Sequence, residues 1–187
     1  MSSREKYAPG AATGAEARKE GDKWTLVLVR ELRHPATKVW RALTDPAQLR
    51  EWAPFDADRN LGTTGPVKLS RVGASAPHVS ETSVRRAEAP RVLEYSWGGN
   101  DIRWELEPLA NGTRLTLWHN IDRRFVSMGA AGWHICFDVL DRFLAGHPID
   151  RIVAGEAMKF GWQRLNAEYA KQFGIDAPSR PPKGPQP

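Results

Sequence analysis

Residues 132–144 read GWHICFDVLDRFL, and this stretch decides the fold that the sequence predicts. Its apolar residues fall on two adjacent stripes of a helix, which ends before Gly146 and Pro148. The stripes are Gly132, Ile135, Cys136, Val139 and Phe143, and Trp133, Phe137, Leu140 and Leu144. A helix with so broad an apolar surface must be largely covered by the rest of the protein.

Antiparallel strands are predicted to provide that cover. A first strand at 24–32 places Leu26, Leu28 and Leu32 on one side. A meander of further strands is expected at 67–71, 81–87, 92–97, 102–109 and 113–121. Turn residues at 98–101 and at Asn111-Gly112 predict hairpins. Alternation at 102–107 indicates one buried and one solvated side.

Helices are predicted at 35–44, 47–52 and 156–173, the last ending at Gly174. The chain order is therefore one strand, two short helices, a strand meander and a long helix. Because a sheet must cover its apolar face, we expect an α+β fold with a curved antiparallel sheet wrapped around the long C-terminal helix.

Length and composition favour one domain. The chain has 187 residues, of which 41% are hydrophobic, enough for one well-buried core. We expect this domain to span residues 24–174. Residues 1–23 are rich in Gly, Ala and charge, and residues 175–187 are dominated by proline, so both are predicted to be flexible tails.

Charge and cysteine content exclude several classes of protein. The net charge of +5 is spread thinly and forms no basic run, so nucleic-acid binding is not expected. No apolar stretch is long enough to span a membrane. Cys136 is the single cysteine, and it shares no helix face with His134, so we expect no metal site and no cofactor. A cytoplasmic location follows as the expectation.

Two sequence motifs resemble those of a known family. HPATKVWRALTDP at 34–46 and LREW at 49–52, with the order of elements, resemble the START-related SRPBCC superfamily. Gly132-Trp133-His134 and Phe160-Gly161-Trp162 fit the bacterial branch named after the activator of heat shock protein 90 ATPase. The resemblance covers residues 24–173 and implies the helix-grip (START/Bet v 1-like) fold. The motifs are structural signatures and identify no ligand.

The resemblance also implies a ligand site between the sheet and the long helix. Mapped onto this chain, it places Trp52 and Phe55 at the mouth, Tyr95, Trp97, Trp104 and His119 on the sheet, and Trp133, His134 and Phe137 on the helix. Pockets of this kind have aromatic walls and a few polar groups. The same rings can instead fill the core, since each buries roughly 150–250 Å².

Three functions stay open on the sequence. The first is binding or sequestration of a small hydrophobic or aromatic molecule by a monomer or homodimer. The second is a cyclase, aromatase or hydrolase that uses His119 and Tyr95 for proton transfer. The third is interaction with a chaperone or a transcriptional regulator, although residues 1–23 lack the Asn/Trp-rich motif of such co-chaperones. No catalytic motif is present, so no catalytic residue is assigned.

Overall fold

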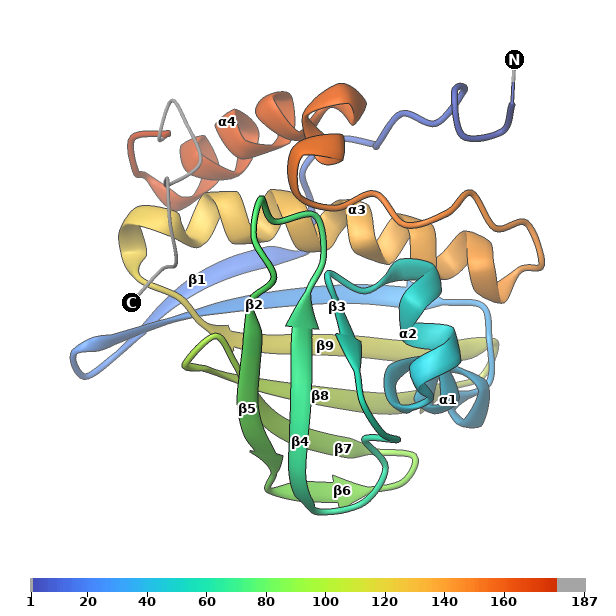
Figure 1. Cartoon of the computed structure of the whole chain (residues 1–187). Coiled ribbons are helices and arrows are strands. Elements are labelled where there is room, and N and C mark those ends of the chain that lie inside the picture. Colours follow the sequence, from blue (N-terminus) through green and yellow to red (C-terminus); the bar gives the residue numbers. More distant parts are fainter. Residues whose placement is uncertain (1, 178–187) are drawn as a thin grey trace.

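Two antiparallel sheets form the framework of the protein, which a computed structural model describes over residues 2–177 (Figure 1). The six-stranded sheet has the order β1-β2-β9-β8-β7-β6, and a three-stranded sheet has the order β3-β4-β5. The strands are β1 (Ala15–Glu20), β2 (Lys23–Leu32), β3 (Phe55–Ala57), β4 (Gly65–Arg71), β5 (Val79–Val84), β6 (Arg86–Glu88), β7 (Val92–Trp97), β8 (Asn100–Leu109) and β9 (Gly112–Asn120).

Alternation fixes which face of the larger sheet is buried. On β8, Ile102, Trp104 and Leu106 are buried, whereas the intervening Arg103 and Glu107 are exposed. Trp104 lies opposite Leu117 of β9, so equivalent side chains share the inner face. The predicted strands at 24–32, 92–97, 102–109 and 113–121 and their two hairpins are therefore confirmed.

Helix α3 (Val126–Leu144) lies across the inner face of the six-stranded sheet (Figure 1). Both predicted stripes are largely buried, because one contacts the sheet and the other contacts α4 (Trp162–Phe173) on the opposite side. Helices α1 (Ala36–Thr44) and α2 (Pro46–Trp52) follow β2 and pack against α3. The predicted helix-grip fold is confirmed.

The strand meander differs from the prediction in one respect. The strand expected at 81–87 is divided at Arg85, because β5 pairs with β4 while β6 pairs with β7. The chain thus passes from one sheet to the other. Strand β3, which is only three residues long and follows Pro54, was not predicted.

The helix predicted at 156–173 is also divided. A 3-10 helix spans Ala154–Phe160, and α4 begins only at Trp162. Between them Gly161 has φ +83°, in the left-handed region that a helix does not use. A Cβ at this position would lie 3.2 Å from the Pro9 ring, so the absence of a side chain at Gly161 also lets the N-terminal segment pack closely against this turn.

The largest difference between prediction and structure is at residues 1–23, which were predicted to form a flexible tail. Residues 15–20 form β1, which pairs with the edge of β2 from Ala15 opposite Leu28 to Glu20 opposite Lys23. The free backbone groups of β2 supply its partners, so a charged sequence can still form an edge strand. Ala17 is partly buried while Arg18 points to solvent. The predicted C-terminal tail at 175–187 lies, from residue 178, outside the described residues.

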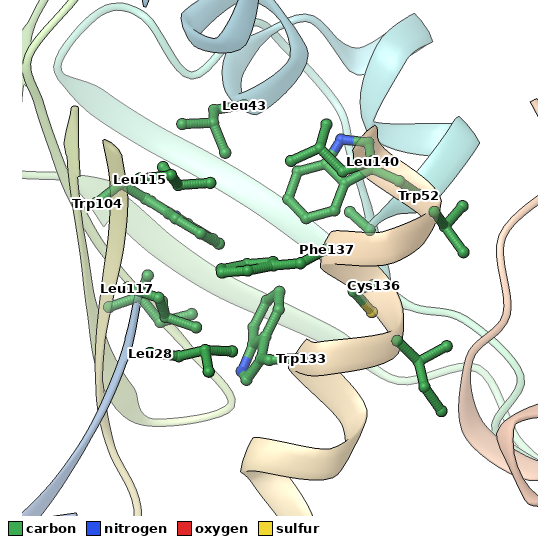
Figure 2. Packing of buried hydrophobic residues seen from close by; sticks show 14 of the residues in the cluster. Leu28, Leu43, Trp52, Trp104, Leu115, Leu117, Trp133, Cys136, Phe137 and Leu140 are labelled. Atoms are coloured by element: carbon green, nitrogen blue, oxygen red, sulfur yellow. The ribbon is translucent and has the colours of Figure 1, made fainter. Parts of the chain in front are cut away.

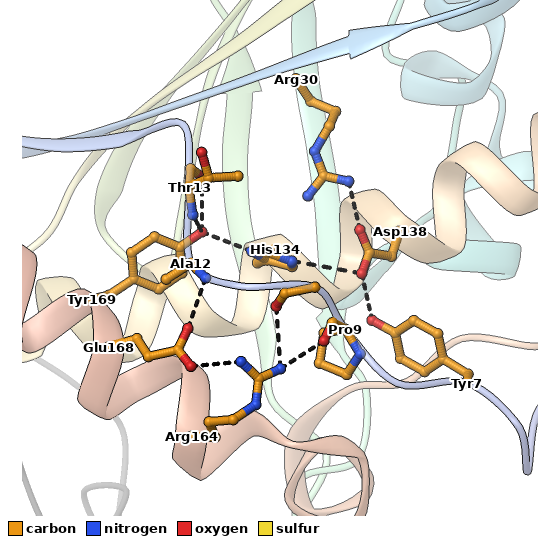
Figure 3. A network of polar contacts seen from close by, with 11 residues as sticks. Tyr7, Pro9, Ala12, Thr13, Arg30, His134, Asp138, Arg164, Glu168 and Tyr169 are labelled. Atoms are coloured by element: carbon orange, nitrogen blue, oxygen red, sulfur yellow. Dashed lines mark hydrogen bonds and ion pairs between the residues drawn. The ribbon is translucent and has the colours of Figure 1, made fainter.

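Residues ahead of β1 are anchored to α3 by Tyr7 (Figure 3). The Tyr7 hydroxyl donates to Oδ2 of Asp138 at 2.7 Å, and Oδ1 of Asp138 accepts from Arg30 of β2 at 2.5 Å. Tyr7 is only 6% exposed. One carboxylate therefore connects α3, β2 and the N-terminal segment.

A second group of contacts holds the same segment against α4 (Figure 3). The Tyr169 hydroxyl donates to the Thr13 carbonyl at 3.0 Å, and the Ala12 amide donates to Glu168 at 2.8 Å. Arg164 donates to the Pro9 carbonyl at 2.6 Å. Residues 2–14 are thus part of the packed domain.

Replacing Tyr7→Phe should lower the free energy of unfolding by about 1–2 kcal/mol, because Asp138 loses one donor in a partly buried site. Urea denaturation of the full chain measures this change. Lys6→Gln, at an exposed neighbour, should leave the free energy unchanged. Equal stability of the Tyr7→Phe protein and the parent would contradict an anchoring role.

Candidate functional site

The structure brings eight of the nine predicted site residues, all except His134, into one aromatic cluster between the six-stranded sheet, β3 and α3. Trp52 comes from the end of α2 and Phe55 from β3. Alternation on the strands and a spacing of four on α3 turn the others toward the same space. These are Tyr95 and Trp97 on β7, Trp104 on β8, His119 on β9, and Trp133 and Phe137 on α3.

Trp104 of the sheet packs against the rings of Trp52, Trp133 and Phe137 (Figure 2). Its ring is 5.5 Å from Trp133, 5.9 Å from Phe137 and 6.0 Å from Trp52, measured between centroids. The Trp52 and Trp133 contacts are edge-to-face, a favoured aromatic geometry. The rings that were expected to line a cavity thus contact one another and fill the middle of the gap.

Three of the indole groups in the cluster, those of Trp104, Trp52 and Trp133, donate a hydrogen bond to a buried acceptor. Nε1 of Trp104 donates to the Tyr95 hydroxyl at 2.9 Å, and Nε1 of Trp52 donates to the Ala42 carbonyl at 3.0 Å. Burial raises the pKa of Tyr95 far above its usual value. Tyr95 therefore stays protonated and serves as a fixed polar contact within the core.

His119 is the exception, because one of its ring nitrogens has no partner. Nε1 of Trp133 donates to Nδ1 of His119 at 3.1 Å, and since an indole can only donate, Nδ1 carries no proton. Burial lowers the pKa of His119 to about 3, so the neutral ring holds its proton on Nε2. Nε2 is buried and, within the described residues, unpaired. The cluster thus contains a hydrogen-bond donor with no acceptor.

Trp97 connects this histidine to the surface. It is the one predicted site residue that is partly exposed. Its ring lies 6.2 Å from the His119 ring and 5.2 Å from Phe55. The guanidinium of Arg71, at the end of β4, lies 5.6 Å from the Trp97 centroid. Trp97 therefore lies between the His119 ring and the surface beside Arg71.

His134, which was expected to approach the gap from α3, points away from it. Its Nδ1 lies 2.7 Å from the Tyr169 hydroxyl and its Nε2 lies 3.7 Å from Asp138 (Figure 3). The prediction is wrong because His134 follows Trp133 by one residue, which turns it toward α4. Asp138 and Tyr169, the polar partners of His134, also bind the N-terminal segment through Tyr7 and Thr13. This hydrogen-bond network therefore has a structural role.

The solvated face of the sheet has two hollows of about 330 and 420 Å³. Their charged side chains neutralise one another, as in the Arg85–Asp101 pair at 3.0 Å and the Arg86–Glu88 pair at 2.7 Å. Nε1 of Trp118 is also buried on this face and has no hydrogen-bond partner within residues 2–177, and the guanidinium of Arg18 lies over its ring. Because their charges are already paired, these hollows are interpreted as ordinary depressions of a solvated sheet face.

Residues 2–177 contain neither a group of metal ligands nor a helix suited to span a membrane. No group of three or more His, Cys, Asp or Glu side chains in this range is placed to hold a metal ion. No helix in the same range combines the length and apolar character needed to cross a membrane. The buried, unpaired Nε2 of His119 next to Trp97 marks the candidate site.

The lowered pKa of His119 predicts a pH-dependent stability. Between about pH 6.5 and pH 3 the unfolded chain binds a proton that the folded chain excludes, so the free energy of unfolding should fall by up to about 1.4 kcal/mol per pH unit as the pH drops. Above this range both states are neutral at this residue and no effect is expected.

Urea denaturation at a series of pH values measures the effect, and His119→Gln should reduce the slope. Part of it should remain, because burial also lowers the pKa of His134. Parallel pH profiles for the parent and the His119→Gln protein would show that His119 is not the group responsible.

Solved structures with the same fold come from several bacteria. EF2215 from Enterococcus faecalis, a conserved protein of unknown function, has a TM-score of 0.64 at 17% identity over 84% of this chain and 89% of that one. CalU16 from Micromonospora echinospora has a TM-score of 0.61 at 21% identity over 85% and 98%. The AHSA1-like protein from Aeromonas hydrophila has a TM-score of 0.55 at 17% identity over 65% and 92%.

At these identities the likeness shows the fold alone. Among the curated proteins, no relative matches the chain. Residues 33–145, from the loop before α1 to the end of α3, match the family described as Activator of Hsp90 ATPase homolog 1-like protein. Because the match spans more than half of the sequence, the chain belongs to the Activator of Hsp90 ATPase homolog 1-like family of the SRPBCC (Bet v 1-like) superfamily.

Proposed function

We propose that this protein binds a small, largely aromatic molecule between the six-stranded sheet and α3, and that Nε2 of His119 donates a hydrogen bond to it. The unpaired Nε2–H is the observation that carries the proposal. A buried donor without an acceptor costs on the order of 1–3 kcal/mol, and a ligand oxygen at this position would remove that cost. The helix-grip fold is compatible with a ligand in this gap.

The surrounding rings determine what kind of molecule fits. His119 is in contact with the rings of Trp97 and Trp133, at 6.2 and 6.0 Å between centroids. Flat apolar molecules bind among such rings through face and edge contacts. An aromatic body with one oxygen acceptor meets both requirements of the site.

Binding requires a side chain to move, because the rings fill the gap in this structure. Trp97 is the side chain that can move at the lowest cost, since it is partly exposed while Trp104, Trp133 and Phe137 are buried. A ligand that binds the state with Trp97 displaced shifts the population toward that state. The site is therefore closed without ligand and opens at the Trp97 end.

Proton-transfer catalysis has less support from the same geometry. An imidazole with a pKa of about 3 is a weak base at neutral pH. The hydroxyl of Tyr95 accepts from Trp104 and has a raised pKa because of burial. Both groups proposed for the cyclase, aromatase or hydrolase alternative are thus poorly suited to exchange protons. No feature of residues 2–177 favours the chaperone or regulator alternative over binding.

We keep the cytoplasm as the proposed location and a monomer or homodimer as the proposed state. Burial raises the pKa of Cys136 to about 12, so its thiol stays protonated in any compartment and is compatible with a reducing one. The paired charges on the outer sheet face support the expectation that nucleic acid is not a partner.

Isothermal titration calorimetry with 2-naphthol and naphthalene tests the proposal. 2-Naphthol has an oxygen acceptor and naphthalene has none, so the protein should bind 2-naphthol more tightly. His119→Phe keeps a ring but removes the donor, and should weaken 2-naphthol binding roughly 5- to 10-fold while leaving naphthalene unchanged.

His147→Phe is the matched control, because His147 is exposed, follows the end of α3 and has no ring contact among residues 2–177. Circular dichroism confirms that each variant is folded. Absence of binding, or equal affinity of the parent and the His119→Phe protein for 2-naphthol, would rule out His119 as the ligand anchor.

A further inference from the structure

We propose that the ligand is an aromatic carboxylate with an oxygen acceptor at its opposite end: the acceptor binds Nε2 of His119, the ring takes the place of the displaced Trp97 ring, and the carboxylate pairs with Arg71 at the surface. This inference rests on the proposed function and adds the ligand's charge and its orientation. It follows from the placement of Arg71, whose guanidinium lies over the ring of Trp97.

Arg71 is a positive charge without a carboxylate partner among the described residues. It is exposed, and its backbone amide donates to the His78 carbonyl at 2.9 Å. Its guanidinium contacts the ring of Trp97 at 5.6 Å. An arginine held over an aromatic ring keeps its planar donor fork available for an anion.

The carboxylates of the neighbouring strands are already paired with other arginines. Asp56 of β3, beside the Phe55 that pairs with Arg71, accepts from Arg151 at 2.7 Å. Asp101 of β8, which raises the pKa of His119 slightly against the effect of burial, pairs with Arg85 at 3.0 Å. An anion approaching Arg71 therefore meets charges that are largely neutralised.

Trp97 connects the two polar groups, because its ring contacts His119 on the buried side and Arg71 at the surface. A flat molecule that takes the place of this ring has a hydrogen-bond donor at one end and a cation at the other. Both groups recognise acceptors. The site thus selects a molecule with an oxygen at each end.

Burial decides which oxygen is charged. Placing a carboxylate beside the neutral, buried His119 would require removing it from water, which is costly without a paired charge. At Arg71 the carboxylate stays partly solvated and gains an ion pair. Exposed pairs contribute modestly, so we expect Arg71 to improve affinity roughly 3- to 5-fold.

Three probes test this orientation in the full chain by isothermal titration calorimetry. They are 2-naphthol, which has only the acceptor, 2-naphthoate, which has only the carboxylate, and 6-hydroxy-2-naphthoate, which has both at opposite ends. The protein should bind 6-hydroxy-2-naphthoate most tightly. Arg71→Gln should weaken both carboxylates roughly 3- to 5-fold and leave 2-naphthol unchanged.

Arg33→Gln is the matched control, because Arg33 is also exposed and has no ion pair among residues 2–177, and it should change none of the three affinities. The advantage of 6-hydroxy-2-naphthoate over 2-naphthol should also decrease at high salt, since a surface ion pair is screened.

The outcomes separate the two proposals. If 2-naphthol binding depends on His119 but Arg71→Gln leaves the carboxylates unaffected, the inference fails and the proposed function stands. If Arg71→Gln weakens 2-naphthol as much as the carboxylates, Arg71 only holds Trp97 in place and the inference is overturned. If 2-naphthol does not bind, or binds independently of His119, both proposals fail.

Discussion

The packing of α3 against the inner face of the six-stranded sheet is the constraint on which the rest of the structure depends. Trp133 and Phe137 of α3 contact Trp104 of β8 at 5.5 and 5.9 Å, so each layer covers the apolar face of the other. Because each large ring buries roughly 150–250 Å², separating the layers would expose most of the core. Helix α4 and the N-terminal segment then pack on the outer side of α3.

The same packing creates the candidate site at the end of the aromatic cluster. Within the cluster, the indole groups of Trp52 and Trp104 find acceptors, so the centre is both apolar and satisfied. At the Trp97 end the pattern stops. Trp133 donates to Nδ1 of His119, which places the ring proton on Nε2, and Nε2 has no acceptor within residues 2–177. A core that is complete in the middle and incomplete at one end is consistent with a molecule that enters from that end.

Much of this arrangement could be predicted, because alternation and helical spacing determine which side chains share a face. Tyr95, Trp97, Trp104 and His119 were expected on one side of the sheet, and they lie there. His134 was misplaced because adjacent helical residues diverge by about 100°, and the sequence does not say which of two stripes faces the sheet. Strand β1 was missed because an edge strand needs only backbone partners, which leave little trace in composition.

By itself, therefore, the sequence determined the layers, the order of elements and the set of rings between them, since these follow from local periodicity and from the need to cover apolar faces. Only the tertiary structure decided that the rings fill the gap, that Nε2 of His119 is unpaired, and that Arg71 lies over Trp97. Such features depend on the distances between side chains from β4, β7, β9 and α3. Those distances are set by how the layers pack together, which periodicity along the chain does not record.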